Sequence, residues 1–73
     1  MTPEMIKLFP KITLEAARVN AHLSQKEAAQ QLGITPQTLA SYERGTTLPD
    51  VAMGKKIERL YAFPLDLIFF PGV

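Results

Sequence analysis

The side chains that could carry covalent or metal chemistry are few in this 73-residue chain. It has no cysteine and a single histidine, His22, and no two carboxylates stand at a spacing that suggests acid–base catalysis. Disulfides and cysteine-containing zinc sites are therefore excluded. The methionines, Met1, Met5 and Met53, are expected to fill the core or the N-terminal arm. We expect no enzymatic activity, no metal and no cofactor.

The remaining chemistry is hydrogen bonding by polar side chains, and the overall charge of the chain does not indicate which class of partner these side chains bind. The net charge is +1, which neither supports nor excludes a nucleic-acid partner. No run approaches the ~20 apolar residues that span a bilayer. The apolar patch of residues 1–10 is interrupted by Glu4 and Lys7, unlike the core of a signal peptide. We therefore expect a cytoplasmic protein with no membrane segment.

Helix-capping residues divide the chain into helices with short connections. Four expected helices follow a side chain that can accept a hydrogen bond from a backbone amide, namely Thr13, Ser24, Thr35 and Asp50. The first helix should end near residues 22–23 and the second before Gly33. The third should end before Gly45 and the fourth at about Tyr61.

The C-terminal part is expected to complete an all-α fold. Pro64 should open a fifth helix, Leu65–Phe69. The fourth helix should face the core with Val51, Ile57 and Leu60. Because no alternating strand pattern is present, the sequence predicts one compact five-helix domain over residues 13–73. An N-terminal arm, residues 1–12, precedes it.

The turn between the second and third expected helices constrains how they pack. Only Gly33 and Ile34 separate the second helix from the cap of the third, so the two helices must cross at a steep angle. A small residue, Ala29, allows the close approach, and Gly33 can adopt the positive φ that the turn requires. Leu39 should then anchor the third helix on the core.

The segment from Gln25 to Arg44 resembles the helix-turn-helix of the lambda-repressor-like, Cro and XRE regulator family. That motif has alanine at its fifth position, glycine at its ninth and an aliphatic residue at its fifteenth, and this chain has Ala29, Gly33 and Leu39 there. The resemblance runs from about Ile12 to Phe70. It implies a sequence-specific regulator, a repressor, of bacterial or phage type that binds double-stranded DNA.

The sequence departs from the family pattern at two places. The family often carries lysine or arginine just after the glycine that ends the recognition helix, and here Thr46 and Thr47 stand there. The fourth helix has Gly54 where an aliphatic core residue is usual. Because an interior glycine costs about 1 kcal/mol relative to alanine, we expect a looser helix at that point.

The second helix of such a motif lies in the major groove with its N-terminal part nearest the bases. The residues expected to face base edges are Pro36, Gln37, Ala40 and Ser41. Gln37 can pair with adenine N6 and N7, and Ser41 can bond several bases. The residues expected near phosphates are Gln25, Thr38, Arg44, Thr46 and Thr47; of these, Gln25 resembles the family residue that holds a phosphate at a helix N-terminus.

Two further expectations concern structure and assembly. Arg18 and Glu43 match a family pair in which an arginine on the first helix meets a glutamate of the recognition helix. The C-terminal segment is richer in apolar residues than one short helix can bury, with Phe63, Leu65, Leu67, Ile68, Phe69 and Phe70. We therefore expect a homodimer through this segment, the arm or both, bound to an inverted-repeat operator.

A competing function stays open at this point. A helix-turn-helix scaffold can also act as a protein-interaction module, such as an antitoxin-like protein that binds a partner, since fold does not dictate function. The low net charge and the threonines at positions 46 and 47 favour that alternative.

Overall fold

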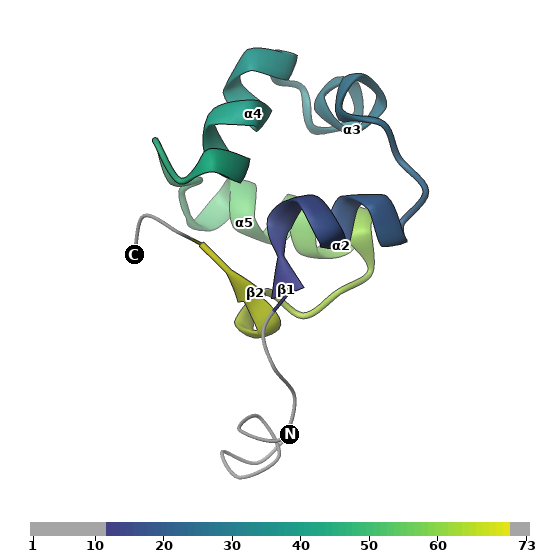
Figure 1. The fold of residues 1–73 in the computed structure, drawn as a ribbon, viewed down its shortest axis with the longest axis vertical. Coiled ribbons are helices and arrows are strands. Elements are labelled where there is room, and N and C mark those ends of the chain that lie inside the picture. The colour runs from purple at the N-terminus through teal and green to yellow at the C-terminus, as the bar shows by residue number, and fades with distance from the viewer. Residues whose placement is uncertain (1–11, 71–73) are drawn as a thin grey trace, which may run out of the picture.

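The computed structural model describes residues 12–70, in which four α-helices surround one core and a short parallel strand pair closes it (Figure 1). The elements are β1 (Ile12–Thr13), α2 (Leu14–Asn20), α3 (Gln25–Leu32), α4 (Pro36–Arg44), α5 (Val51–Tyr61), a 3₁₀ turn η1 (Leu65–Leu67) and β2 (Ile68–Phe69). The prediction of a mainly helical domain is confirmed. Of the expected arm, only Ile12 lies within the described residues.

The caps that define the four helices are those expected from the sequence. Each N-cap side chain accepts a hydrogen bond from the backbone amide three residues later, at 2.8–3.1 Å, in Thr13, Ser24, Thr35 and Asp50. Ser24 also donates its backbone amide to the Glu27 carboxylate at 3.0 Å, and this bond lowers the pKa of Glu27. Gly33 and Gly45 end α3 and α4 with φ of 76° and 79°, which L-residues rarely adopt.

The expected fifth helix, Leu65–Phe69, is wrong. Leu65–Leu67 form one 3₁₀ turn, after which Ile68 and Phe69 extend and pair in parallel with Ile12 and Thr13. An isolated five-residue helix has too few hydrogen bonds to offset its nucleation. The β-branched and aromatic residues at 68–69 instead suit a strand, and Ile12 offers them a partner from the other end of the described chain.

Two other boundaries or faces differ from expectation. Helix α2 ends at Asn20, because the chain turns at His22 with φ of 61°, so it is shorter than predicted. Val51 was expected in the core but is 75% exposed. The buried stripe of α5 runs through Gly54, Ile57 and Tyr61. Val51 continues that stripe by one turn, but it stands at the first position of the helix, beyond the end of the core.

The core lies where the four helices and β2 meet. Leu14, Leu39 and Ile57 are its largest fully buried side chains, one each from α2, α4 and α5. Helix α3 contributes Ala28 and Ala29, both 0% exposed, so its backbone lies close to its neighbours. The core therefore holds α3 against α5 and α4 against α2.

Gly54 is a packing residue rather than a weak point of α5. A Cβ at this position would lie 3.0 Å from Cδ2 of Leu65, tighter than ordinary contact. The missing side chain therefore lets the 3₁₀ turn settle on the helix. None of the helices in residues 12–70 is long and apolar enough to cross a membrane.

Candidate nucleic-acid interface

Helices α3 and α4 form one end of the molecule, opposite the β1–β2 pair (Figure 1). Gly33 turns the chain between them, and the amide of Ile34 donates to the Ala29 carbonyl at 3.0 Å, which completes the end of α3. Leu32 from α3 and Leu39 from α4 are buried in the shared core. The two helices are thereby held as one unit by packing and by the turn.

Helix α4 has a buried side and an exposed side. Leu39 is 0% exposed and fixes the helix on the core, whereas Gln37, Ser41 and Arg44 follow one another at i, i+4 and i+7. Gln37 and Arg44 are exposed and Ser41 is half-buried. An Arg44 Nη2 donates to Ser41 Oγ at 3.5 Å, which directs the guanidinium along this stripe. The stripe presents hydrogen-bonding groups to whatever meets this end.

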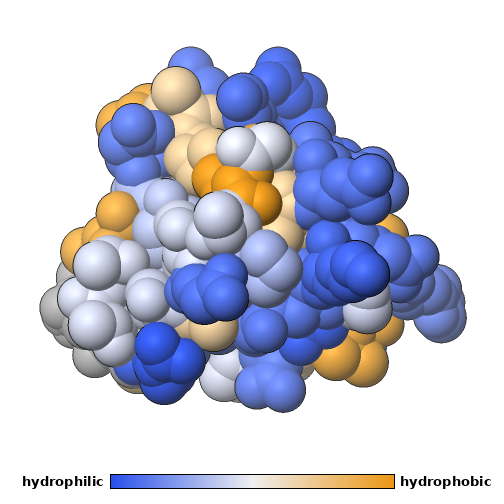
Figure 2. All heavy atoms as spheres, turned by 90° about the horizontal axis from the view of Figure 1, so that it is seen from above, coloured by the Kyte–Doolittle hydropathy of each residue, from blue (hydrophilic) through white to orange (hydrophobic). Residues whose placement is uncertain are grey.

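The remaining base candidates lie beside this stripe. Pro36 is exposed at the first position of α4, and Ala40 is half-buried. The view onto the α3 and α4 end shows mainly hydrophilic residues, with hydrophobic ones near its middle and along its edges (Figure 2). This end therefore combines polar groups with small apolar contacts.

The threonines expected near phosphate have different environments. Thr38 shares a hydrogen bond of 2.9 Å with the Thr35 hydroxyl, so it supports the start of α4. Thr46 and Thr47 are exposed, but their backbone amides donate to the Ser41 carbonyl at 3.0 and 3.5 Å. At these two positions an anion would meet the side-chain hydroxyls rather than the amides.

A buried charge cluster joins the recognition unit to α2. Arg18 Nε donates to Glu43 Oε2 at 2.8 Å, and the two side chains are 11% and 7% exposed. Arg18 also donates to the Leu23 carbonyl at 2.8 Å, and Gln25 Nε2 donates to the second Glu43 oxygen at 3.1 Å. Arg18 and Glu43 thus form the pair that the family resemblance implies. Through Glu43 the cluster connects α2, α3 and α4.

A polar hollow of about 390 Å³ opens over this cluster, between the start of α3 and the middle of α4. Ser24 and Gln25 line it from α3, and Ala40 and Arg44 line it from α4. The first backbone amides of a helix have no partner within that helix and carry partial positive charge. The hollow therefore places a helix N-terminus, two guanidinium groups and an amide side chain beside the carboxylates of Glu15 and Glu43. The N-terminus, the guanidinium groups and the amide can hold an anion, whereas the carboxylates oppose one.

Residues 14–68 match the family Helix-turn-helix, HTH_3, whose members are lambda-repressor-like and XRE-type domains. The chain belongs to this family. HTH_3 is a family of DNA-binding regulatory domains, and membership supports a helix-turn-helix regulator. No curated protein and no solved structure matches the chain.

Two features of this helix-turn-helix domain were not foreseen from its sequence. The Gln25–Glu43 contact joins residues 18 positions apart, and no local spacing signals it. Tyr61 of α5 is 4% exposed, and its hydroxyl has no hydrogen-bond partner among the described residues. Burial raises the pKa of Tyr61 to about 12, the negative charge of Glu43 adds to the rise, and Arg18 opposes it.

Metal chemistry has no site in the described part of this helix-turn-helix domain. Residues 12–70 contain no group of three or more histidine, aspartate or glutamate side chains close enough together to hold an ion.

Proposed function

We propose that the chain is a sequence-specific double-stranded DNA-binding regulator, a repressor, that acts in the cytoplasm and inserts α4 into the major groove. The observation that carries this proposal is the exposed side of α4, because Gln37 stands free on its first turn while Leu39 is fully buried beneath it. A reading helix needs this combination, since its side chains must reach base edges from a rigidly held backbone.

Base readout rests on four residues of α4. Gln37 makes a bidentate contact to adenine N6 and N7, and Ser41 adds a single hydrogen bond. Pro36 and Ala40 offer apolar contacts that suit a thymine methyl group. Gln37 and Pro36 are exposed, which supports contacts from the first turn of α4, and the half-burial of Ala40 and Ser41 supports smaller contributions from these two residues.

Phosphate contacts come from the rim of the same end. Arg44 provides the charge, and Gln25 provides the N-terminus of α3 together with its side-chain amide. Thr46 and Thr47 contribute hydroxyls, and Thr38 lies at the start of the reading helix. Because these groups include a single cation, one subunit binds DNA weakly.

Two copies related by a two-fold axis supply the remaining affinity. A dimer places two α4 helices in successive major grooves, about 34 Å apart, so the operator is an inverted repeat. The C-terminal apolar segment and the N-terminal arm are the proposed sources of the dimer contact. Within that segment Leu67 and Ile68 are 8% and 3% exposed, so they serve the core of their own subunit.

The test compares two variants of α4 on a selected site and on a scrambled site. Gln37→Ala should cost about 1–3 kcal/mol on the selected site and relax preference at one base position per half-site. Arg44→Ala should weaken both sites about equally and flatten the salt dependence, because it removes one phosphate contact. If Gln37→Ala leaves the ratio of the two affinities unchanged, α4 does not read the sequence.

The alternative function is an antitoxin-like protein-interaction module. The observation in its favour is the loop after α4, where Thr46 and Thr47 are exposed and carry no charge. Titration of the pure protein against mixed genomic DNA fragments at low salt separates the two functions. Retention of the fragments supports the regulator, and a complete lack of retention favours the interaction module.

A further inference from the structure

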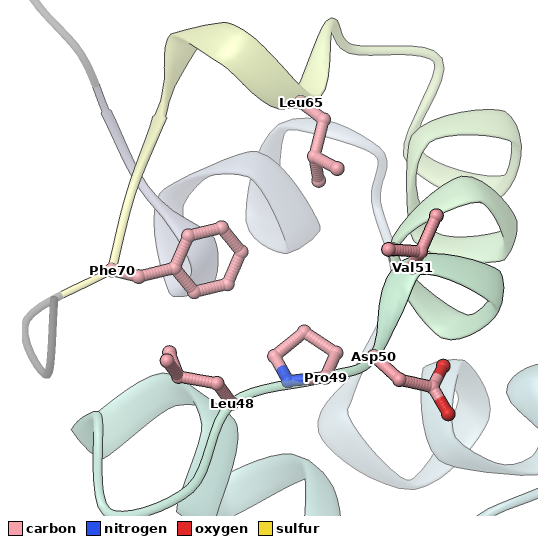
Figure 3. Close-up of a pocket in the computed structure, with 7 residues that line it drawn as sticks. Leu48, Pro49, Asp50, Val51, Leu65 and Phe70 are labelled. Atoms are coloured by element: carbon pink, nitrogen blue, oxygen red, sulfur yellow. The ribbon is translucent and has the colours of Figure 1, made fainter.

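An apolar groove at the start of α5 has no role in the DNA-binding proposal. It has a volume of about 230 Å³, and its lining includes Leu48, Pro49, Val51, Gly54, Leu65 and Phe70. Phe70 and Leu65 reach into it from the C-terminal segment, and Leu48, Pro49 and Val51 approach from the loop before α5 and its first turn (Figure 3). Asp50 also lines it, but the Asp50 carboxylate points away from the groove and caps α5. The groove therefore suits an apolar, uncharged occupant.

The walls of the groove leave apolar surface in contact with solvent. Val51 is 75% exposed and Leu48 is 49% exposed, although both line the groove. Gly54 lines it without a side chain, so the α5 wall does not fill the space in front of it. Covering these side chains is favourable in proportion to the apolar area that is removed from water.

The N-terminal arm joins the domain beside one wall of this groove. Ile12, the first described residue, pairs with Ile68, and two residues of the wall, Leu65 and Phe70, lie within three residues of Ile68 in the sequence. The 11 residues that precede Ile12 reach up to about 36 Å when they are extended. The arm can thus reach the groove of its own subunit, and its attachment gives it a high effective concentration there.

The arm contains a short segment whose two sides differ in charge. Ile6 and Leu8 are separated by Lys7. Because successive side chains of an extended chain point to opposite sides, Ile6 and Leu8 share one side and Lys7 lies on the other. Phe9 shares the side of Lys7 and is not assigned to the groove. One side of this segment can therefore enter an uncharged groove while the ammonium group of Lys7 stays in water.

We propose that residues 6–8 of the arm lie extended in the apolar groove of their own subunit, with Ile6 and Leu8 against its walls and Lys7 in solvent. The arm is the occupant because it is attached next to the groove and carries apolar side chains that the described core does not use. This docking does not depend on the proposed function.

The docked arm connects two segments that are far apart in the sequence. Leu48 and Pro49 of one wall directly follow Thr47, and Phe70 of another wall follows β2. The arm therefore steadies the loop after α4, which the proposed function places near phosphate, without a contact to DNA. An arm that fills its own groove leaves the C-terminal segment as the source of the proposed dimer contact, and Phe69 is 48% exposed there.

The first test uses the absence of cysteine from the chain, because two introduced cysteines then report on a single contact. Leu8→Cys combined with Val51→Cys should form an intramolecular disulfide in glutathione buffer, with an effective concentration at least about tenfold above that of Lys7→Cys combined with Val51→Cys. The second pair is the matched control, since it differs by one position along the same tether. Val51 is 75% exposed, so its replacement should leave the helices intact, which circular dichroism verifies.

The second test measures the loop that the arm steadies. The amide of Thr46 donates to the Ser41 carbonyl at 3.0 Å, and its hydrogen exchange should be several-fold faster when both Ile6→Ser and Leu8→Ser are present. Lys7→Ser is the control and should leave the exchange rate unchanged.

Three results would overturn the proposal. The two cysteine pairs could form disulfides equally well, the serine variants could exchange at the same rate as the control, or the disulfide could join two chains rather than close within one. Non-reducing electrophoresis distinguishes the last case, which would place the arm on a second copy. Neither measurement contains DNA, so failure of the chain to bind an operator would remove the proposed function and leave the docked arm in place.

Discussion

Glu43 lies at the centre of the buried charge cluster, so its replacement tests how much that cluster stabilises the domain. Glu43→Ala removes the acceptor for Arg18 and for Gln25 and leaves the Arg18 guanidinium, 11% exposed, without its carboxylate. Breaking a buried pair in this way costs about 3–5 kcal/mol. Because Arg18 keeps its bond to the Leu23 carbonyl, we expect a loss near the lower end, about 3 kcal/mol.

That loss is large for a chain of this size. A domain of 73 residues is expected to have a free energy of unfolding of about 4–11 kcal/mol. A loss of ~3 kcal/mol should lower the melting temperature by roughly 12–24 °C. Urea unfolding followed by circular dichroism gives the free energy directly, and the slope should stay constant if the change acts on the folded state.

The control is the second carboxylate near Arg18. Glu15 lies 4.0 Å from the guanidinium but is 67% exposed, so Glu15→Ala should change the free energy of unfolding by less than about 0.5 kcal/mol. Replacing both Arg18 and Glu43 by methionine should lower the free energy of unfolding less than replacing either one alone, because a single replacement leaves the other charge buried and unpaired. If Glu43→Ala and Glu15→Ala unfold at the same midpoint, the cluster does not hold the domain together and the reasoning is refuted.

Three further changes test the fold. Tyr61→Phe should raise the free energy of unfolding by about 1 kcal/mol at neutral pH, because the buried hydroxyl has no partner. The raised pKa of Tyr61, about 12 against the ordinary 10, means that stability fully present below pH 10 is lost as pH rises toward 12. That loss should be smaller in Tyr61→Phe than in the parent chain, and equal losses would exclude this origin. Gly54→Ala should stabilise α5 by clearly less than the ~1 kcal/mol of helix propensity, and by the full amount in a Leu65→Ala background, as chemical denaturation would show. Ser24→Ala should cost about 1 kcal/mol in chemical denaturation, because it removes the hydroxyl that accepts from the Glu27 amide, and an unchanged free energy of unfolding would contradict the role of the cap. The variant keeps the backbone amide of residue 24, so the pKa of Glu27 should stay below its ordinary value in a carbon-detected NMR titration.

The sequence predicted those parts of the fold that depend on local chemistry. Caps such as Ser24 and the left-handed glycines Gly33 and Gly45 act within a few residues of their own position, and all of them stand where they were expected. The short turn at Gly33 likewise brings α3 against α4. The Arg18–Glu43 pair was reached through a family resemblance, since 25 residues separate the partners.

The parts that were not predicted depend on contacts between distant segments. The local sequence around Ile68 is equally compatible with the end of a short helix. Its pairing with Ile12 is what makes this segment a strand. Val51 continues the apolar stripe of α5, and nothing local shows that the core ends one turn below it. The contact between Gln25 and Glu43 joins two helices, so it could not be predicted from residues near Gln25 in the sequence. The environment of the Tyr61 hydroxyl likewise depends on distant residues, Glu43 and Arg18 among them.

The pairing of β1 with β2 has a consequence for the order in which this domain forms as it is synthesised. Helices α2 to α5 contain their own caps and can begin to form as they leave the ribosome. Ile12 has no strand partner until Ile68 has been synthesised. The contact between these two residues closes almost the whole described chain into one loop. A contact of such long sequence separation forms late, after the helices have shortened the path between its ends. Until then the α2 end of the core lacks its last layer, so a nascent chain gains its full stability only when nearly all of the domain has been translated.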